Sequence, residues 1–364
     1  MLKAVDPLFI QHTQSGLYAT SPRVPVRLKV GEKAAHLLLA LREPADVEEI
    51  SIPGAAPDGV REMAAQLTKA GFLVQDTDSD QYPAAWSQWG TVAWLFHEQI
   101  RDAPFVNIDS SDADEYKQDL SQRTRPSSFK DHGDAPVLLL PRVWSRLDIS
   151  LKDVLEGRRT HRKFTGQPVT LDDFSTILHY GFAPLRFANA GQMGVLPLRA
   201  NASGGSRHET EAYVAVINVE GIDPGLYLYD GIRHALILIN PDTDGAVLDH
   251  LTYEQGFFGD SAAFGIITSA VVERMTWKYP HPRAYKLMMH NVGTVIQNFS
   301  MITWALGLGA AITGGFRDTE TEQELKLDPM KEFPTFFMSC GVPERADNGM
   351  PVSYRTARTA PDSY

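Results

Sequence analysis

Residues 212–219 read AYVAVINV, and this continuous apolar run, rich in Val, decides the fold. A run without polar alternation is typical of a strand that is buried on both faces. The next stretch, residues 221–239, reads GIDPGLYLYDGIRHALILI. It places an Asp-Gly pair, a preferred two-residue turn, between an alternating run and an apolar run, which predicts a β-hairpin. The centre of the chain is therefore expected to be a sheet.

Elements on both sides of this stretch complete the expected core. Residues 264–272 (FGIITSAVV) and 335–343 (TFFMSCGVP) are predicted as further strands, and residues 171–180 (LDDFSTILHY) have helical spacing. Residues 290–306 predict an amphipathic helix. Its apolar face carries Val292, Val295, Ile296, Phe299, Ile302 and Leu306. Strands interleaved with helices predict an α+β fold, a mixed sheet packed by helices.

The N-terminal part of the chain predicts a small mixed unit. A strand is expected at residues 24–30, helices at 32–41 and 58–67, and a second strand at 71–76. Helices followed by a strand resemble a winged helix. No Lys/Arg cluster marks a recognition helix, so DNA binding is disfavoured, and peptide binding and a purely structural role stay open.

Two further segments divide the chain. Residues 84–102 (AAWSQWGTVAWLFHEQIRD) predict an aromatic-rich helix, either a packing helix or a ligand surface, that closes a first domain over 1–102. Residues 103–136 are polar and rich in helix breakers, so we expect a linker or mobile loop over 103–145. A second domain is then expected over 146–364.

Composition excludes several classes of protein. The chain has 34 Lys and Arg against 45 Asp and Glu, a net charge of −11, and such a surface repels phosphate backbones and anionic lipid. Its single cysteine, Cys340, allows no intramolecular disulfide and no Cys-rich metal site. We therefore expect a protein of the reducing cytoplasm that binds no nucleic acid, no membrane and no metal.

Membrane segments are not expected either. The N-terminus lacks the apolar core and cleavage site of a signal peptide. Residues 299–316 (FSMITWALGLGAAITGGF) come near the length of a membrane span, but they carry four glycines and three hydroxyl side chains and end at Arg317–Asp318. A buried helix that runs into a glycine-rich loop explains this segment better.

Common catalytic motifs are absent. Residues 307–314 have the wrong spacing for a dinucleotide fingerprint and lack the Lys-Ser/Thr of a P-loop. His97–Glu98 and His208–Glu209 lack the second histidine of a zinc protease, and residues 201–205 miss the first glycine of a nucleophile elbow. Hydrolase, kinase and metalloenzyme functions therefore have little support.

Three weak signals are compatible with a phosphate-bearing, flat ligand. Each combines backbone freedom or cations with hydrogen-bond donors, and each has a plain alternative as a solvated or simple turn. The first lies in residues 157–164 (GRRTHRKF), the second in 202–205 (ASGG) and the third in 313–317 (TGGFR). The candidate binding residues are Arg158, Thr160, Arg162, Ser203, Gly204, Gly205, Gly314, Gly315 and Arg317.

Lys278 and Tyr279 are the candidate catalytic residues. They lie between a predicted buried strand and a predicted helix, where functional loops are common. A lysine in an apolar pocket has a lowered pKa and acts as a base, and a tyrosine relays a proton. On an extended segment the two side chains are expected to point to opposite faces. The alternative is an exposed lysine beside a packing aromatic.

The order of these motifs resembles the nitroreductase-like flavoproteins and, more narrowly, the SagB/McbC-type dehydrogenases. That type oxidises thiazolines and oxazolines in ribosomal peptides to thiazoles and oxazoles. The resemblance rests on RRTHRKF, SGGSRHETEAYVAV, PGLYLYD with His234, WKYPHPRAYK, GTVIQN and TGGF, and covers residues 151–343. The first half resembles, more loosely, the winged-helix-like peptide clamp of that type.

The resemblance implies a nitroreductase-like FMN-binding fold in which the nine binding residues named above hold FMN. It implies that Lys278 and Tyr279 are the catalytic pair. It also implies a homodimer with each flavin at the subunit interface, a peptide or small heterocyclic substrate, and a cyclodehydratase partner.

Three departures from the pattern bear on the substrate. The usual Pro-Ser is Ala202–Ser203, the usual Asp-Ala-Gly-His is Asn291–Thr294, and Pro280 and Pro282 follow the Lys-Tyr pair. Two other functions are therefore weighed against azoline dehydrogenation. One is an NAD(P)H-dependent flavin reductase of nitro, quinone or dehydroamino-acid substrates, and the other is a flavin-free peptide-binding scaffold.

Overall fold

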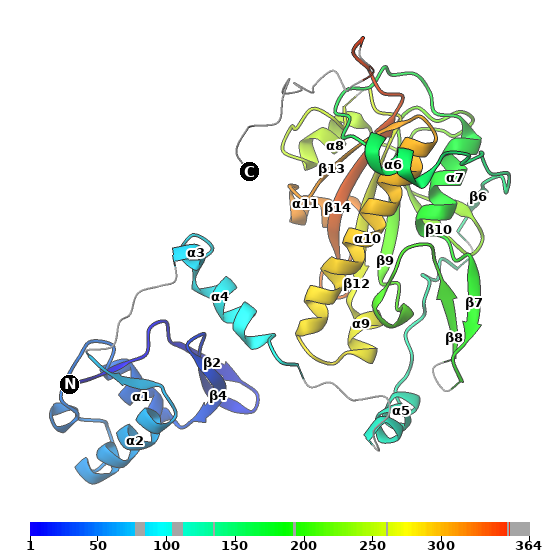
Figure 1. The fold of residues 1–364 in the computed structure, drawn as a ribbon. Helices are drawn as coiled ribbons and strands as arrows, with labels where there is room; N and C mark the ends of the chain where they lie inside the picture. The colour runs from blue at the N-terminus through cyan, green and yellow to red at the C-terminus, as the bar shows by residue number, and fades with distance from the viewer. Residues whose placement is uncertain are drawn as a thin grey trace. The chain divides into compact units, whose positions relative to one another are not determined.

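A computed structural model describes residues 1–76, 84–103, 112–133, 135–191, 194–259, 261–347 and 349. The chain divides into two compact units, Met1–Pro104 and Phe105–Tyr364 (Figure 1). The first unit ends close to the boundary predicted at residue 102. None of the described helices combines the length and apolarity that a membrane crossing requires.

The first unit contains two small sheets and two main helices. β1 (Leu2–Ala4) pairs with β5 (Leu73–Gln75), and an antiparallel meander is formed by β2 (Phe9–Thr13), β3 (Gly16–Ser21) and β4 (Val24–Val30). α1 (Glu32–Ala40) and α2 (Pro57–Lys69) confirm the two predicted helices, and η1 (Val47–Glu49) lies between them in the chain. α2 starts on a proline and buries Val60, Ala64 and Leu67 on one face. α3 (Ala84–Ser87) and α4 (Gly90–Gln99) divide the helix predicted over 84–102.

The second unit is built on a seven-stranded sheet with the order β13-β14-β12-β9-β10-β11-β6. Its strands are β6 (Val137–Leu139), β9 (Thr210–Val216), β10 (Gly225–Asp230), β11 (Ala235–Asn240), β12 (Phe264–Val271), β13 (Gly309–Thr313) and β14 (Glu332–Gly341). Every neighbouring pair of these strands is antiparallel. Parallel pairing occurs among the described residues only as isolated bridges, such as Thr160 to Ala310. The described strands of this sheet are therefore antiparallel throughout, and the prediction of a mixed sheet was wrong.

β9 explains why the apolar run at 212–219 determines the fold. All seven of its residues are buried. Ala212 and Val214 face a core that includes α7 (Leu171–Phe182) and α10 (Arg283–Ala305). Tyr213 and Ala215 face a second core that includes α8 (Gly245–Leu251). Because alternate residues of a strand point to opposite faces, the sheet needs apolar side chains on both.

Figure 1 shows α10 running along one face of the sheet over β9, β12 and β14. The predicted amphipathic helix at 290–306 is confirmed as its C-terminal part, and the predicted hairpin is confirmed as β10 and β11. Shorter elements complete the unit: α6 (Leu151–Gly157), the hairpin β7 (Arg186–Asn189) and β8 (Val195–Leu198), η3 (Gly204–Ser206), α9 (Val272–Lys278) and α11 (Asp318–Glu324).

The segment predicted as a linker over 103–145 differs from that expectation. It contains α5 (Asp112–Gln122) and the sheet strand β6, and both belong to the second unit. Residues 123–130 are held to this unit by polar contacts. Lys130 forms a 2.5 Å ion pair with buried Glu332, and Arg274 Nε donates to the Ser127 carbonyl at 2.8 Å. Polar composition suggested a linker, but these polar groups form ion pairs and hydrogen bonds with buried residues of the second unit.

Candidate functional site

Lys278 and Tyr279 meet at a single glycine. Lys278 is the last residue of α9 and Tyr279 caps it, so the pair lies at a helix end rather than on the predicted extended segment. Gly205 has φ +62, and a Cβ placed on it would lie 2.6 Å from Tyr279 Oη and 2.7 Å from Lys278 Nζ. Both side-chain tips therefore reach the same point, and the expectation that they point to opposite faces was wrong. Only glycine fits here, for its conformation and for its size.

The turn that carries Gly205 rests on a buried polar network. Ser203 Oγ accepts from the His208 amide at 2.9 Å, and the Gly204 amide donates to Asn291 Oδ1 at 3.1 Å. Asn291 Nδ2 in turn donates to Glu209 Oε1 at 2.8 Å. Glu209 is fully buried, and burial raises the pKa of its carboxyl. This network fixes the backbone of the 203–205 turn relative to α10.

The electrostatics around the pair favour a neutral lysine. Burial, and then the neighbouring Arg207, lower the pKa of Lys278, while burial raises the pKa of Tyr279. Arg207 Nε donates to the Gly205 carbonyl at 3.1 Å, and its guanidinium lies over the Trp277 ring at 4.8 Å. A lysine with a lowered pKa serves as a base at neutral pH. Lys278 is thus the better candidate base of the two.

The segment predicted as a linker covers this site. Tyr116 on α5 donates its hydroxyl to the Lys278 carbonyl at 2.5 Å. Arg123 donates to the Trp277 carbonyl at 3.3 Å, and Trp277 Nε1 donates back to the Arg123 carbonyl at 3.4 Å. These contacts place α5 and the residues after it against the end of α9. Sequence reasoning missed Tyr116 and Arg123, and no local pattern marks them.

A second group of candidate residues lies beside β13. Arg158 caps α6, Thr160 bridges to Ala310, and the His161 amide donates to the Ala310 carbonyl at 2.8 Å. The segment from Arg158 to Arg162 is thereby aligned with the edge strand of the sheet. The ion pairs among the described residues include neither Arg158 nor Arg162, whose guanidinium lies 5.9 Å from the centre of the Phe257 ring, so both charges are available to a phosphate.

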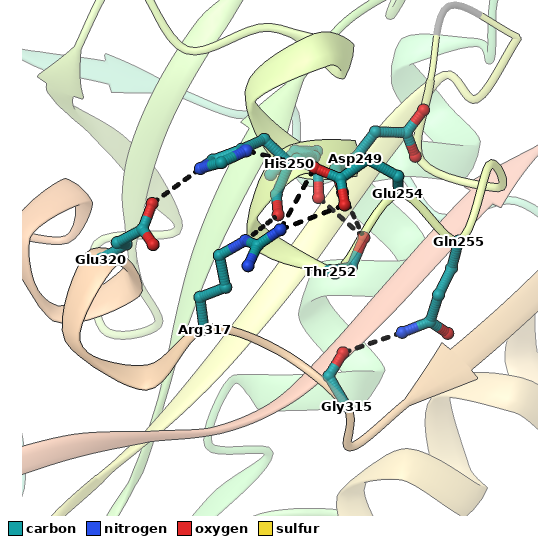
Figure 2. Close-up of polar contacts among 9 residues, drawn as sticks. Asp249, His250, Thr252, Glu254, Gln255, Gly315, Arg317 and Glu320 are labelled. Carbon is teal, nitrogen blue, oxygen red and sulfur yellow. Dashed lines mark hydrogen bonds and ion pairs between the residues drawn. The ribbon is translucent and has the colours of Figure 1, made fainter.

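Gly314 and Gly315 follow β13 directly, and both are exposed. Gln255 Nε2 donates to the Gly315 carbonyl at 2.8 Å (Figure 2). Exposed glycine backbone at a strand end is what a flat ring needs for close approach. Gly314 and Gly315 therefore remain suitable for contact with a flavin ring.

Arg317 is engaged by the chain itself. Figure 2 shows its guanidinium directed at the loop after α8. Its Nε donates to the His250 carbonyl at 2.8 Å, its Nη2 lies 3.1 Å from Glu254 Oε2, and its guanidinium lies 4.5 Å from the centre of the Tyr253 ring. These contacts tie residues 250–254 to the glycine loop. In this arrangement Arg317 positions the loop, and its assignment as a direct phosphate ligand stays a prediction.

The candidate residues thus fall into two groups. Ser203, Gly204 and Gly205 lie with Lys278 and Tyr279, between α9 and α10. The residues from Arg158 to Arg162 lie along β13, whose end carries Gly314, Gly315 and Arg317. The donors fit FMN in kind: the guanidinium groups of Arg158 and Arg162 for a phosphate, a hydroxyl, and glycine backbone for a planar ring.

Comparison with known proteins agrees with this chemistry. The model of the nitroreductase family matches residues 155–342. The protein MJ1384 of Methanocaldococcus jannaschii, named as a nitroreductase, is 32% identical over 209 residues, covering 57% of this chain and 98% of its own length. The trifolitoxin-processing protein TfxB of Rhizobium leguminosarum is 26% identical over 269 residues, 70% of this chain and 71% of that protein.

Among solved structures, the similar chains include one from the Escherichia coli microcin synthetase McbBCD complex with truncated pro-MccB17 bound. It is 19% identical and covers 63% of this chain and 87% of that chain, with a TM-score of 0.43.

Proposed function

The chain belongs to the nitroreductase family, and on this premise we propose that it dehydrogenates thiazoline or oxazoline rings, in a ribosomally made peptide or related natural product, to azoles. At the coarser level it is an oxidoreductase, and FMN is its cofactor. The finer assignment rests mainly on one observation, the seating of Lys278 and Tyr279 together against Gly205.

The pair supplies what azoline oxidation needs from the protein. Aromatising the ring removes a proton from one carbon and a hydride from its neighbour. Bound FMN supplies the acceptor for the hydride. Burial and Arg207 lower the pKa of Lys278, which favours the neutral form that takes the proton at Nζ. Tyr279, whose pKa is raised, stays protonated and donates a hydrogen bond that orients the ring.

We assign FMN binding to the two groups of residues described above. Arg158, Thr160 and Arg162 would hold the phosphate. Glycine backbone of the 203–205 turn and of Gly314–Gly315 would contact the ring system, with Ser203 as a donor and Arg317 behind the loop. We also propose a homodimer with each flavin at the subunit interface, as the resemblance to the family implies.

A peptide substrate is supported by the similarity to TfxB, whose name assigns it to trifolitoxin processing. The first unit, which we propose to be winged-helix-like, would hold a leader peptide. A cyclodehydratase that forms the azoline would then be the partner enzyme. Pull-down of leader peptides by the full chain, compared with a variant that lacks residues 1–103, tests this role.

The proposal is tested by spectroscopy and then by turnover. The purified protein should show flavin absorption near ~450 nm and release FMN on heating. Lys278→Ala should retain bound FMN but lose about 10²–10⁴ in the rate of azole formation. Lys286→Ala removes an exposed lysine of α10 and serves as the control. Unchanged turnover in Lys278→Ala would remove this lysine from the mechanism.

A second candidate function is favoured by the similarity to MJ1384, which covers nearly the whole of that protein. In this alternative the flavin accepts electrons from NAD(P)H and reduces a nitro, quinone or dehydroamino-acid substrate. Anaerobic stopped-flow mixing with NADPH separates the two functions. Reduction faster than turnover favours the reductase, and negligible reduction favours the dehydrogenase.

A further inference from the structure

Two basic side chains meet at Gly205. The Lys278 amine lies against its Cα, since an added Cβ would be 2.7 Å from Nζ. The Arg207 guanidinium holds the carbonyl of the same residue at 3.1 Å. A protonated Lys278 and Arg207 would repel each other at this range, and a folded protein normally places a carboxylate between two such groups.

No such carboxylate is present in the described part of the chain. The groups that shift the pKa of Arg207 electrostatically are Arg125, Tyr279 and Tyr116, and the group that shifts the pKa of Lys278 is Arg207. None of these is an acid. The absence does not follow from composition, because the chain has eleven more acidic than basic residues.

Arg207 is also incompletely bonded. It is 3% exposed, and its buried Nη2 has no hydrogen-bond partner. Contact with the Trp277 ring offsets part of the desolvation through a cation–π interaction. The rest of the desolvation penalty of a buried, unpaired cation stays uncompensated.

Arg274 shows how the same fold treats an arginine that has only a structural role. It too is 3% exposed, but it forms a 2.5 Å ion pair with buried Glu211. It also donates to the Ser127 and His208 carbonyls. Two arginines of equal burial in neighbouring positions thus differ in one respect. Arg274 has its counter-ion in the chain, and Arg207 does not.

We propose that Arg207 and Lys278 form a subsite for a carboxylate-type oxyanion of the substrate, with the Tyr279 hydroxyl as a further donor. The proposal deepens the proposed function and rests on it for the identity of the substrate. The half-buried Lys278 and Tyr279 form the exposed side of the subsite, and Arg207 lies behind them. A substrate with an ionised carboxylate beside the reacting ring, or a carbonyl that gains negative charge as the neighbouring carbon loses its proton, would pair with Arg207 and stabilise the protonated Lys278.

Calorimetric titration with benzoate, and with its neutral isostere benzamide, tests the subsite without any need for turnover. We expect saturable binding of benzoate to the FMN-loaded protein and at least tenfold weaker binding of benzamide. Arg207→Met should weaken benzoate at least tenfold and leave benzamide unchanged, whereas Arg207→Lys should restore part of the difference. Arg186→Met, on the exposed face of β7, is the control for loss of one charge.

Three results would overturn the proposal: equal affinity of the wild-type protein for benzoate and benzamide, unchanged benzoate affinity in Arg207→Met, or stronger binding of inorganic phosphate than of benzoate. The first and third comparisons use the wild-type protein, so a poorly folding variant does not remove the test. Failure of azoline turnover with intact benzoate selectivity would refute the proposed function alone.

Discussion

Gly205→Ala separates the backbone role of this glycine from its role in the site. An L-residue at φ +62 occupies the left-handed region, which costs about 1–2 kcal/mol. The lower conformational entropy that Ala gives the unfolded chain offsets about 0.4–1 kcal/mol of this cost. In a unit of this size the midpoint of thermal unfolding should fall by about 2–4 °C for each kcal/mol.

The second effect of the substitution is a displacement. The new Cβ would lie 2.6 Å from Tyr279 Oη and 2.7 Å from Lys278 Nζ, whereas ordinary contacts begin at 3.4 Å. The two tips must therefore retreat by about 0.8 and 0.7 Å. All of these contacts, including Lys278 Cδ at 2.8 Å, are with side chains, so the retreat moves no backbone and adds little to the loss of stability. A misplacement of about 1 Å at a reacting group lowers the rate on the order of 10²-fold.

Gly221→Ala is the matched control. Gly221 has φ +72, and a Cβ placed on it meets nothing within 4 Å. Both variants should lose the same stability by differential scanning calorimetry. Only Gly205→Ala should lose kcat, by about 10–100-fold, in an assay of azole formation on the FMN-loaded protein. Equal kcat in the two variants would refute the inference that this turn positions the Lys-Tyr pair.

Three further predictions concern buried charges. Burial raises the pKa of Glu209, so its ionisation opposes folding as the pH rises above about 4.5. In urea titrations Glu209→Gln should therefore gain stability relative to the wild type between pH 4.5 and 7. A constant difference in stability between the two proteins over this range would contradict this. Arg274→Met leaves Glu211 buried without its partner, so its free energy of unfolding in guanidinium should fall by about 3–5 kcal/mol. The double variant Arg274→Met with Glu211→Gln should recover part of this loss. A loss below about 1 kcal/mol would show that the pair is dispensable. Burial lowers the pKa of three histidines, so the unfolded chain binds protons that the native state does not. Below pH 6.5 the free energy of unfolding should therefore fall by about 1.4 kcal/mol per pH unit for each histidine. A flat stability profile from pH 6.5 to 4 would show that these histidines do not contribute. These are His161 and His234, with a pKa of about 4, and His208, with a pKa of about 3.

The sheet could be predicted because its information is local. β9, β10, β11 and β12 are apolar runs bounded by turn residues, and burial on two faces leaves a strong signal in sequence. The order of the strands could not be predicted. β14 lies between β13 and β12, and β6 forms the far edge, through pairings between segments far apart in the chain.

Local patterns marked the candidate residues, but only the resemblance joined them into one site. Gly205 and Lys278 are separated by more than seventy residues, and no periodicity shows that they touch. The segment around Tyr116 and Arg123 was misjudged for a related reason. Its anchors are single polar contacts to the backbone of α9, and hydrophobic patterning cannot detect them.

The two proposals are coupled through charge. When Lys278 accepts a proton from substrate carbon, it becomes a second cation beside Arg207, and Coulomb repulsion opposes that step in an empty site. An oxyanion held by Arg207 removes the repulsion and leaves a neutral pair in its place. Lys278 would thus be a base that accepts its proton favourably only when substrate is bound. The pH dependence of kcat should therefore report a higher pKa for Lys278 in the substrate complex than kcat/KM reports for the free enzyme, and Arg207→Met should reduce the difference between the two values.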